Sequence, residues 1–372
     1  MADGGSFEIF LACPPGLEGA LADEAREAGF RDPRPDRGGV VIEGGWPEVW
    51  RANLTLRGAV RVLTRIGAFR AFHLAQLDKR ARKFPWLTVL RADVPVRVDV
   101  TTNRKSKIYH AGAAQQRIET ALAESAGVAV SAKAEVTIKA RIDDNLVILS
   151  VDTSGESLHK RGHKPAIGKA PIRETMAAMF LRQCGFSGDE PVFDPMCGSG
   201  TFVLEAAEMA AELLPGRGRT FAFEQLASFD AAQWTEMRQP VDRTRTTQRF
   251  RGSDRNAGAF TAARANAERA GVADLVTFQK ASVSEIAPPE GPPGLVIANP
   301  PYGTRIGERA KLFPLYSALG TSLRERFGGW RVGIVTTEAS LIGAMNLPLG
   351  PPGPVVPHGG LKVRLWQTGP LP

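Results

Sequence analysis

The sequence has few cysteines and histidines, and neither residue type is spaced to hold a metal or to build a disulfide framework. The three cysteines among the 372 residues, Cys13, Cys184 and Cys197, lie far apart, and no two of them form a CxxC pair. The five histidines also lack the spacing of a metal site. This usage is typical of a protein in the reducing cytoplasm. We therefore expect a cytoplasmic protein that binds no metal.

Long apolar runs are missing as well, since no stretch of about 18 apolar residues occurs. The first six residues are polar and glycine-rich, and amphipathic sequence rather than an apolar signal core follows them. We expect neither a membrane span nor a targeting segment. Hydrophobic residues make up 43% of the chain and charged residues 23%, as in globular domains, and the length allows two or three domains.

Positive charge is in excess, and the excess is local. The net charge is +8 and the pI about 9.6. Between Arg57 and Arg117 there are fourteen Lys and Arg against three Asp, a net charge of +11 that exceeds the value for the whole chain. Any single cation is more often part of a solvated face, but the whole stretch favours a phosphate-binding surface. The residues predicted to form that surface are Arg104, Lys105, Lys107, Tyr109 and His110.

The first 157 residues show short strands mixed with helices. Apolar spacing predicts strands at 7–12 and 40–43 around a helix at 17–28, which is typical of a small α+β domain that ends near residue 66. Further strands are predicted at 94–101, 136–140 and 146–152, with a helix at 113–126.

From about residue 158, strands alternate with helices, which predicts an α/β domain with a mainly parallel sheet. The predicted strands are 192–194, 249–254, 275–281, 295–298, 331–336 and 361–366. The predicted helices are 172–183, 201–213, 258–270 and 312–327.

The first motif joins a buried strand to a helix through glycine. The strand ends in Asp194, and the turn through Gly198 and Gly200 opens into a helix at Thr201. Glycine lets the backbone approach a ligand, and ligands bind at the carboxyl ends of such strands. The spacing is neither a dinucleotide GxGxxG nor a P-loop. The acidic strand end favours a ligand with a cationic amino group, and a plain strand–helix turn is the alternative.

The second motif is Asp254, at the end of the next strand. A carboxylate there is placed to accept ribose hydroxyls, although Asp also commonly caps the helix that follows. The 60 residues from Asp194 to Asp254 exceed an ordinary βαβ interval, so 215–250 is predicted to be an insertion. It contains Trp234 and a basic end formed by Arg243, Arg245, Arg249 and Arg251.

The third motif, Asn299-Pro300-Pro301-Tyr302, follows the strand at 295–298. Two prolines hold the backbone rigid, so the Asn299 side-chain oxygen and the Pro300 carbonyl can each accept one N–H of an aromatic amine. The nitrogen lone pair is then freed towards a methyl donor, and Tyr302 can stack on an extruded base. A Pro-Pro turn that merely ends a strand is the alternative, which the order of the three motifs disfavours.

These motifs resemble those of a class I methyltransferase that acts on amino groups. The segments at 155–163 and 170–174 are similar to those of THUMP-containing RNA methyltransferases, above all the bacterial large-subunit ribosomal RNA guanine-N2 methyltransferase family. The resemblance implies a ferredoxin-like segment at 1–66, a THUMP domain at 67–157 and a Rossmann-like methyltransferase domain with a seven-stranded sheet at 158–372. It also implies structured RNA as the partner, ribosomal RNA more than transfer RNA, and expects no second methyltransferase module after Trp366.

The resemblance further implies S-adenosylmethionine as the cofactor. The cofactor-binding residues that it implies are Asp194, Met196, Cys197, Gly198, Ser199, Gly200, Thr201, Asp254 and Ser282, and the catalytic residues are Asn299, Pro300, Pro301 and Tyr302. Ser282 is a departure, because many members of the family have there an Asp that contacts the adenine of the cofactor. A serine hydroxyl can still accept a hydrogen bond from the adenine amino group, but the charge is lost.

Other functions stay open at this point. The Asn-Pro-Pro-Tyr motif serves adenine-N6 methylation of RNA or DNA equally well, and guanine-N2 methylation of transfer RNA fits the same domains. A protein-glutamine methyltransferase shares the tetrapeptide but has no need of the basic stretch. An RNA-binding assembly factor with a decayed cofactor site is an alternative of another class, suggested only by Ser282. The sequence predicts neither the target nucleotide nor the oligomeric state.

Overall fold

The computed structural model describes residues 5–162, 172–239, 246–303 and 306–372, with only the backbone described at 306–309 and 311. Of the segments and residues named above, the last residue of 155–163, the first two residues of 170–174, and Arg243 and Arg245 lie outside this part of the chain. The described residues form two compact units. The first unit comprises Met1–Cys13, Leu21–Leu158 and Arg219–Pro240, and the second comprises Pro14–Ala20, His159–Gly218 and Val241–Pro372.

A seven-stranded sheet in the order β2-β3-β1-β4-β7-β6-β5 organises the first unit. Its strands are β1 (Phe7–Ala12), β2 (Arg34–Asp36), β3 (Gly39–Gly44), β4 (Arg61–Arg70), β5 (Val96–Thr102), β6 (Val136–Asp143) and β7 (Leu146–Asp152). Neighbours are antiparallel except β5 and β6, which are parallel. Because β4 pairs with both β1 and β7, the predicted boundary near residue 66 falls within a strand. The three predicted domain ranges remain predictions.

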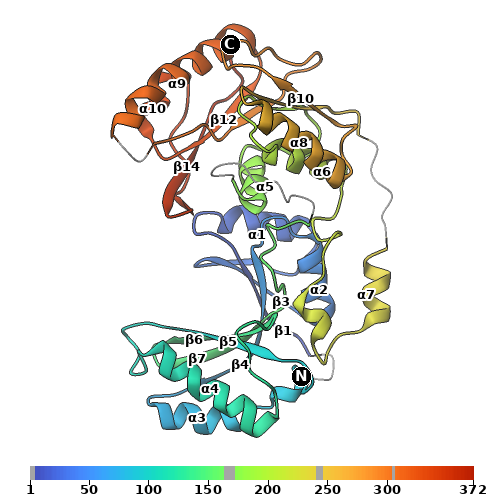
Figure 1. Cartoon of the computed structure of the whole chain (residues 1–372), viewed down its shortest axis with the longest axis vertical. Coiled ribbons are helices and arrows are strands. Elements are labelled where there is room, and N and C mark those ends of the chain that lie inside the picture. Colours follow the sequence, from blue (N-terminus) through green and yellow to red (C-terminus); the bar gives the residue numbers. More distant parts are fainter. Residues whose placement is uncertain (1–4, 163–171, 240–245, 304–305) are drawn as a thin grey trace. The chain divides into compact units, whose positions relative to one another are not determined.

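The described helices of the first unit can be followed in Figure 1. They are α1 (Glu18–Glu27), which begins in the second unit, α2 (Trp46–Thr55), α3 (Leu74–Arg82), α4 (Ala111–Ala126) and α7 (Ala231–Met237). Figure 1 shows α3 and α4 side by side, and α4 packs against β5. Buried apolar side chains at Ala114, Ile118 and Leu122 explain why α4 keeps this face inward.

Part of the predicted insertion belongs to the first unit, although its flanking sequence belongs to the second. The ring of Phe223 lies 4.9 Å from that of Trp234 and 6.1 Å from that of Trp50 on α2. The backbone N–H of Phe223 also donates to the Thr153 carbonyl at 3.0 Å. Aromatic burial of this size stabilises a packing contact strongly. Residues 219–239 therefore complete the core of the first unit.

The second unit has a mainly parallel seven-stranded sheet, as the resemblance implies, in the order β10-β9-β8-β11-β12-β14-β13. Its strands are β8 (Val192–Asp194), β9 (Phe250–Asp254), β10 (Val276–Lys280), β11 (Leu295–Ala298), β12 (Arg331–Thr336), β13 (Val356–His358) and β14 (Leu361–Gln367). The first five are mutually parallel, and β14 pairs antiparallel with β12. The sequence analysis missed β13, because it lies in a Pro- and Gly-rich stretch.

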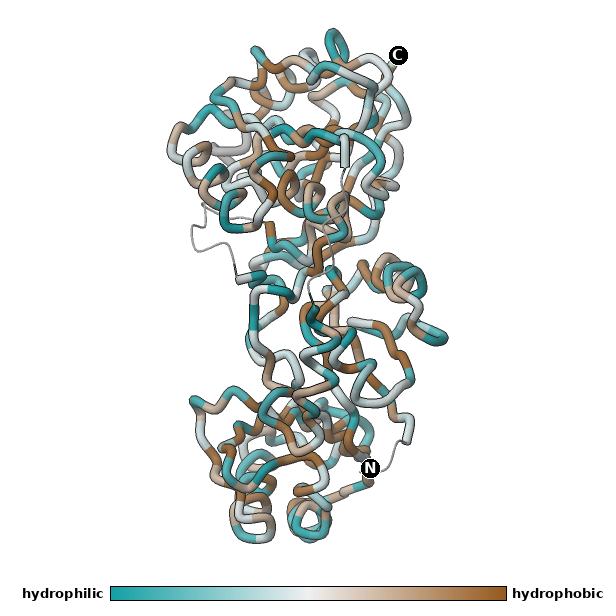
Figure 2. Tube along the Cα trace, turned by 90° about the vertical axis from the view of Figure 1, so that its right-hand side faces the viewer, coloured by the Kyte–Doolittle hydropathy of each residue, from teal (hydrophilic) through white to brown (hydrophobic). Residues whose placement is uncertain are grey.

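The helices of the second unit are α5 (Glu174–Gln183), α6 (Thr201–Ala210), α8 (Ala257–Ala270), α9 (Ile306–Arg326) and α10 (Ala339–Ala344). The predicted helix at 312–327 is α9, which begins six residues earlier. Buried side chains that include Phe193, Val296 and Phe327 form the core of this unit. In Figure 2, hydrophobic segments concentrate in the interior of each unit.

Two features are absent from the described residues. Within them, no helix is both long and apolar enough to cross a membrane. The same part of the chain shows no group of three or more His, Cys, Asp and Glu side chains placed to share a metal ion.

Candidate functional site

A cavity of about 550 Å³ lies at the carboxyl ends of four neighbouring parallel strands, β8, β9, β10 and β11. Loops in parallel sheets meet at this edge, which is where α/β proteins bind their ligands. The lining residues are Pro195, Met196, Gly198, Asp254, Arg255, Asn256, Ala281, Ser282, Val283, Asn299, Pro300, Pro301, Tyr302 and Leu315. Segments more than 100 residues apart in the sequence thus form one site.

The turn after β8 forms one wall. Gly198 and Gly200 have φ values of +51° and +87°, a region that favours glycine. A Cβ atom on Gly198 would meet nothing within 4 Å, so open space lies above its backbone. At the start of this turn, the Met196 N–H donates to Asp194 Oδ1 at 2.9 Å. Burial raises the pKa of Asp194 to about 8, with nearby Asp254 as a smaller cause, so a cation placed beside it would favour its charged form.

Asp254, at the end of β9, is oriented by two backbone hydrogen bonds. Gly198 N–H donates to its Oδ2 at 3.0 Å, and Asn256 N–H donates to its Oδ1 at 2.8 Å. Each carboxylate oxygen has a second lone pair, so the group can accept two more hydrogen bonds from a ligand. Asp254 caps no helix, because Asn256 is the N-cap of α8. The turn after β8 and the end of β9 are thereby joined.

Asn299 and the two prolines follow β11 directly. The side-chain oxygen of Asn299 is buried and has no hydrogen-bond partner among the described residues. Leaving a buried acceptor unpaired costs about 1–3 kcal/mol, and at the wall of a cavity a ligand can supply the missing donor. The Asn299 side chain and the backbone of Pro300 thus offer acceptors at one edge of the cavity.

Tyr316 on α9 holds this loop through a hydrogen bond to its backbone. It is fully buried, and its hydroxyl donates to the Pro301 carbonyl at 3.3 Å and lies 3.1 Å from Thr336 Oγ1. Burial raises the pKa of Tyr316 to about 12, so the phenol stays a donor at neutral pH. Burial also raises the pKa of Tyr302. The sequence analysis missed Tyr316, because nothing local signals a contact with the loop.

The structure divides the predicted site residues into two groups. Those that line the cavity are Met196, Gly198, Asp254, Ser282, Asn299, Pro300, Pro301 and Tyr302. Those beside it but outside its lining are Asp194, Cys197, Ser199, Gly200 and Thr201. The Cys197, Ser199 and Thr201 side chains are buried, and the Ser199 carbonyl accepts from Asn266 at 3.1 Å. This second group shapes the turn.

At least three of the fourteen cations in the basic stretch of the first unit are paired with acids that lie outside it in the sequence. Arg61 contacts Asp152 at 2.5 Å, and Arg65 contacts Glu8 at 2.5 Å. Further pairs on this stretch are Arg82–Glu124, Arg91–Asp93 and Arg97–Asp99. The local net charge of +11 therefore overstates the positive charge that is available to a binding partner.

The loop between β5 and α4, residues 103–110, is different, and we call it the basic loop. Its backbone is anchored, since Lys107 N–H donates to Asn145 Oδ1 at 2.8 Å and Lys105 N–H donates to Asn103 Oδ1 at 3.0 Å. Within the described chain, no ion pair forms at Arg104, Lys105 or Lys107.

Aromatic rings lie beside the basic loop. Tyr109 is 65% exposed, and its ring centroid lies 4.9 Å from that of His110. The Lys107 amine lies 5.8 Å from the centre of the Phe72 ring, which is 41% exposed. Exposed rings next to cations suit a nucleic acid with accessible bases. The sequence analysis missed Phe72, which is 35 residues from Lys107.

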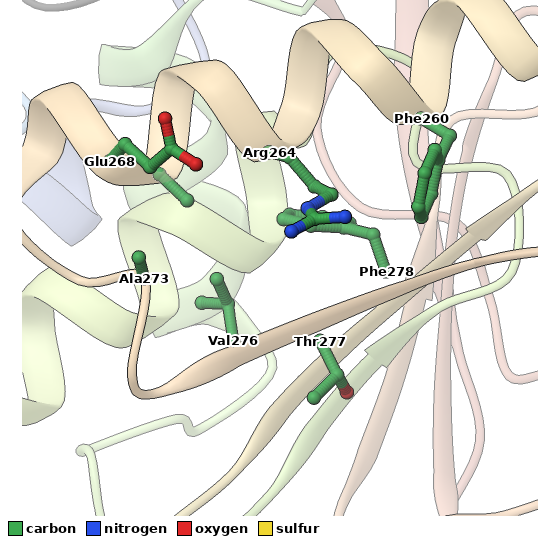
Figure 3. Close-up of a pocket in the computed structure, with 8 residues that line it drawn as sticks. Phe260, Arg264, Glu268, Ala273, Val276, Thr277 and Phe278 are labelled. Carbon is green, nitrogen blue, oxygen red and sulfur yellow. The ribbon is translucent and has the colours of Figure 1, made fainter.

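A second, smaller cavity of about 250 Å³ lies at the edge strand β10. Figure 3 shows Phe260, Arg264 and Glu268 on α8 above Val276, Thr277 and Phe278. It contains none of the strand-end carboxylates or the amide of the larger cavity. The larger cavity is therefore the candidate active site.

Comparisons with known proteins agree with this geometry. Residues 161–348 match the family described as RMKL-like, methyltransferase domain, and residues 8–63 match the RlmL ferredoxin-like domain. The Ribosomal RNA large subunit methyltransferase K/L of Chromohalobacter salexigens is 35% identical over 90% of this chain and 48% of its own length. The chain thus spans about half the length of that relative.

Two other proteins match over nearly their whole length. A Synechocystis protein that carries an RNA methyltransferase name is 30% identical over 96% of this chain and 95% of its own. The crystal structure of SMU.472 complexed with SAH has a TM-score of 0.88 at 26% identity and covers 99% of both chains.

Proposed function

The chain belongs to the RMKL-like methyltransferase family, and we propose that it transfers a methyl group from S-adenosylmethionine to the exocyclic N2 amino group of a guanine in large-subunit ribosomal RNA. The observation that carries the proposal is the buried, unpaired side-chain oxygen of Asn299 at the edge of the cavity. The K/L relative supports ribosomal RNA by its name. We place the activity in the cytoplasm, where bacterial ribosomal RNA is modified.

The cavity residues fit this cofactor. Asp254, already oriented by two backbone N–H groups, would accept the ribose hydroxyls, and the open backbone at Gly198 leaves room beside them. Asp194, which lies beside the cavity but outside its lining, would face the amino group of the methionine part, which favours the charged carboxylate. When bound, S-adenosylmethionine supplies an electrophilic methyl group on its sulfonium. The SMU.472 structure is complexed with SAH, the compound that remains after S-adenosylmethionine has given up its methyl group, and this supports the assignment.

Asn299 and Pro300 act on the nitrogen that is to be methylated. An aromatic amine is a poor nucleophile, because its lone pair is delocalised into the ring. When the Asn299 side-chain oxygen and the Pro300 carbonyl accept its two N–H groups, the nitrogen turns towards a tetrahedral geometry and its lone pair becomes available. Acceptors that are already fixed cost no reorganisation during the reaction. Tyr316 keeps the loop in place through the Pro301 carbonyl.

The target base must leave its helix to reach this site, because the guanine amino group lies on the pairing edge. Extrusion costs a few kcal/mol, and least in RNA that is not yet fully folded. Tyr302, half-buried in the cavity wall, would stack on the extruded base. The basic loop, with exposed Tyr109 beside its cations, would bind the surrounding RNA.

The test is methylation of total RNA by the purified protein with methyl-labelled cofactor, followed by separation of RNA species and nucleoside analysis. We expect the label in N2-methylguanosine of large-subunit ribosomal RNA, and no label with the Asn299→Ala variant. Label in N6-methyladenosine, in transfer RNA or in added DNA would contradict the proposed substrate while leaving the methyltransferase activity intact. If no nucleic acid of any kind becomes labelled, the proposed activity is contradicted.

A further inference from the structure

The order of the strands fixes where each part of a bound nucleoside cofactor lies. From the catalytic strand β11, the sheet continues through β8 and β9 to the edge strand β10. Neighbouring strands are about 4.8 Å apart, so a ligand that reaches from Asn299 past Asp254 extends to the end of β10. Lys280, the last residue of β10, lies opposite Asp254 in the register between β10 and β9. The cavity wall beyond the ribose position is therefore formed by Ala281, Ser282 and Val283.

Ser282 presents the side-chain hydroxyl in this part of the wall, and its hydrogen bonds define its direction. The hydroxyl donates to Glu285 Oε2 at 2.9 Å, and the Ser282 N–H donates to the same oxygen at 3.0 Å. The Ser284 hydroxyl lies 2.8 Å from that of Ser282. A hydroxyl has one proton and two lone pairs. The Ser282 hydroxyl donates its proton to Glu285, and it can accept one hydrogen bond from the Ser284 hydroxyl. One lone pair of the Ser282 oxygen then remains to accept a hydrogen bond from a ligand.

We propose that Ser282 and Glu285 act as a pair that accepts a hydrogen bond from the amino group of the cofactor's adenine. The inference rests on the proposed use of S-adenosylmethionine. Glu285 supplies, through Ser282, the negative charge that an Asp at position 282 would supply directly. Its carboxylate keeps the Ser282 proton turned towards itself, so the hydroxyl can only accept from the ligand. A charge-assisted donor bond of this kind is also stronger than a neutral one.

The pair has a second physical role that must be separated from this one. A Ser with a Glu three residues later is the pattern of a capping box, in which the Glu side chain accepts the backbone N–H of the Ser. That role stabilises the turn at 283–285 whatever the cavity holds. It requires an acceptor at position 285 but no charge, and it makes no distinction between ligands. Glutamine at 285 therefore keeps the turn and removes the charge.

The experiment measures the dissociation constants of S-adenosylhomocysteine and S-inosylhomocysteine by calorimetry. In the second ligand a carbonyl oxygen replaces the adenine amino group, so it faces the Ser282 lone pair with another lone pair. The neighbouring ring nitrogen N1 also carries a proton there, so the change of preference in the variants, rather than the wild-type preference alone, isolates the contribution of the pair. We expect the wild type to prefer the adenine ligand by about tenfold or more, since one hydrogen bond is lost and an acceptor is left unpaired. The preference should fall at least about threefold in Glu285→Gln and in Ser282→Ala. The control Glu290→Gln, an exposed carboxylate on the same loop, should keep the wild-type preference.

The outcomes separate this inference from the proposed function. If the wild type binds the two ligands equally, or if Glu285→Gln keeps the full preference, the pair does not read the amino group, whereas the cofactor assignment stands. If the wild type binds neither ligand, the cofactor assignment itself fails. A loss of thermal stability in Glu285→Gln without a change in preference would assign the residue to the turn alone.

Discussion

The cavity of the second unit and the basic loop of the first differ in how their functional groups are held. In the cavity, Asp254 is oriented by two backbone N–H groups and the Pro301 carbonyl by the Tyr316 hydroxyl. In the basic loop the backbone is anchored, but the cationic side chains and Tyr109 extend into solvent. A fixed, buried group can contribute strongly by itself to catalysis or ligand binding, whereas each exposed cation adds only a small contribution to the free energy of RNA binding. Single substitutions should therefore have much larger effects in the cavity than in the loop.

The largest effect is expected for Asn299→Ala. The variant removes one of two acceptors that draw the target nitrogen towards reaction, and loss of one such fixed hydrogen bond lowers a rate by about 100-fold or more. Single-turnover methylation measures the rate, and calorimetry with S-adenosylhomocysteine should show unchanged cofactor affinity. A variant that retains more than about a tenth of the wild-type rate would remove Asn299 from the catalytic role.

A smaller effect, about tenfold on the methylation rate, is expected for Tyr316→Phe, which corresponds to about 1.4 kcal/mol. The variant keeps the buried ring and removes only the hydroxyl that donates to the Pro301 carbonyl. Because Tyr316 acts through the loop, kcat should fall while cofactor affinity stays the same. Thr336→Val tests the other hydroxyl contact as a control and should have less effect, since the Thr336 hydroxyl contacts that of Tyr316 and, among the described residues, forms no hydrogen bond with residues 299–302. Equal losses of rate and thermal stability in both variants would indicate a purely structural role for Tyr316.

The charge state of Asp194 should make cofactor binding depend on pH. Burial raises its pKa to about 8, so below pH 8 the free protein holds a proton there. A ligand with a cationic amino group favours the ionised carboxylate, so affinity should rise from pH 6.5 to 8 and then level off. Binding at pH 7 should release about 0.9 proton, the fraction held by a group with a pKa of about 8.

Calorimetry in two buffers of different ionisation enthalpy counts the protons that are released. Asp194→Asn should abolish the release, although it also weakens binding. Release of a full proton by that variant would show that another group titrates.

The smallest effect per residue is expected in the basic loop. Replacing Lys105 and Lys107 with Glu should weaken RNA binding and reduce the slope of log K against log salt by about one unit per lost phosphate contact. Cofactor affinity should not change. Arg91→Ala is the matched control, because Arg91 is exposed but already paired with Asp93 at 2.6 Å. An unchanged slope in the Lys105/Lys107 variant, or an equal loss in the control, would make the loop an ordinary solvated surface.

The two regions also differ in how far the sequence predicts them. The strand-end motifs at Asp194, Asp254 and Asn299 were found because each is local, and parallel strands bring their carboxyl ends together by geometry. Eight of the predicted residues accordingly line one cavity. Tyr316 was missed, because its contact with Pro301 depends on the packing of α9 against the core that also contains β11. Glu285 was open to detection, since Ser282 and Glu285 have the spacing of a capping box.

In the first unit, long-range pairing limited the prediction. The acids that neutralise Arg61 and Arg65 are 91 and 57 residues away in the sequence, so composition alone overstated the free charge. The aromatic packing of Phe223 and Trp234 against α2 likewise has no local signal, and an insertion in the second half of the sequence became part of the first unit. The main strands and helices of the second unit were predicted, because apolar periodicity reports burial directly. In the first unit the central strand β4 and the helices α2 and α3 were missed.

The central claim is that the buried acceptor at Asn299 serves the amino group of a guanine in large-subunit ribosomal RNA. The most direct measurement is digestion and mass analysis of ribosomal RNA from a strain that lacks this protein, complemented with the wild type or with Asn299→Ala. We predict that one N2-methylguanosine is missing from the large-subunit RNA, that the wild type restores it and that Asn299→Ala does not. Loss of N6-methyladenosine instead, a change in transfer RNA alone, or restoration by Asn299→Ala would contradict the account.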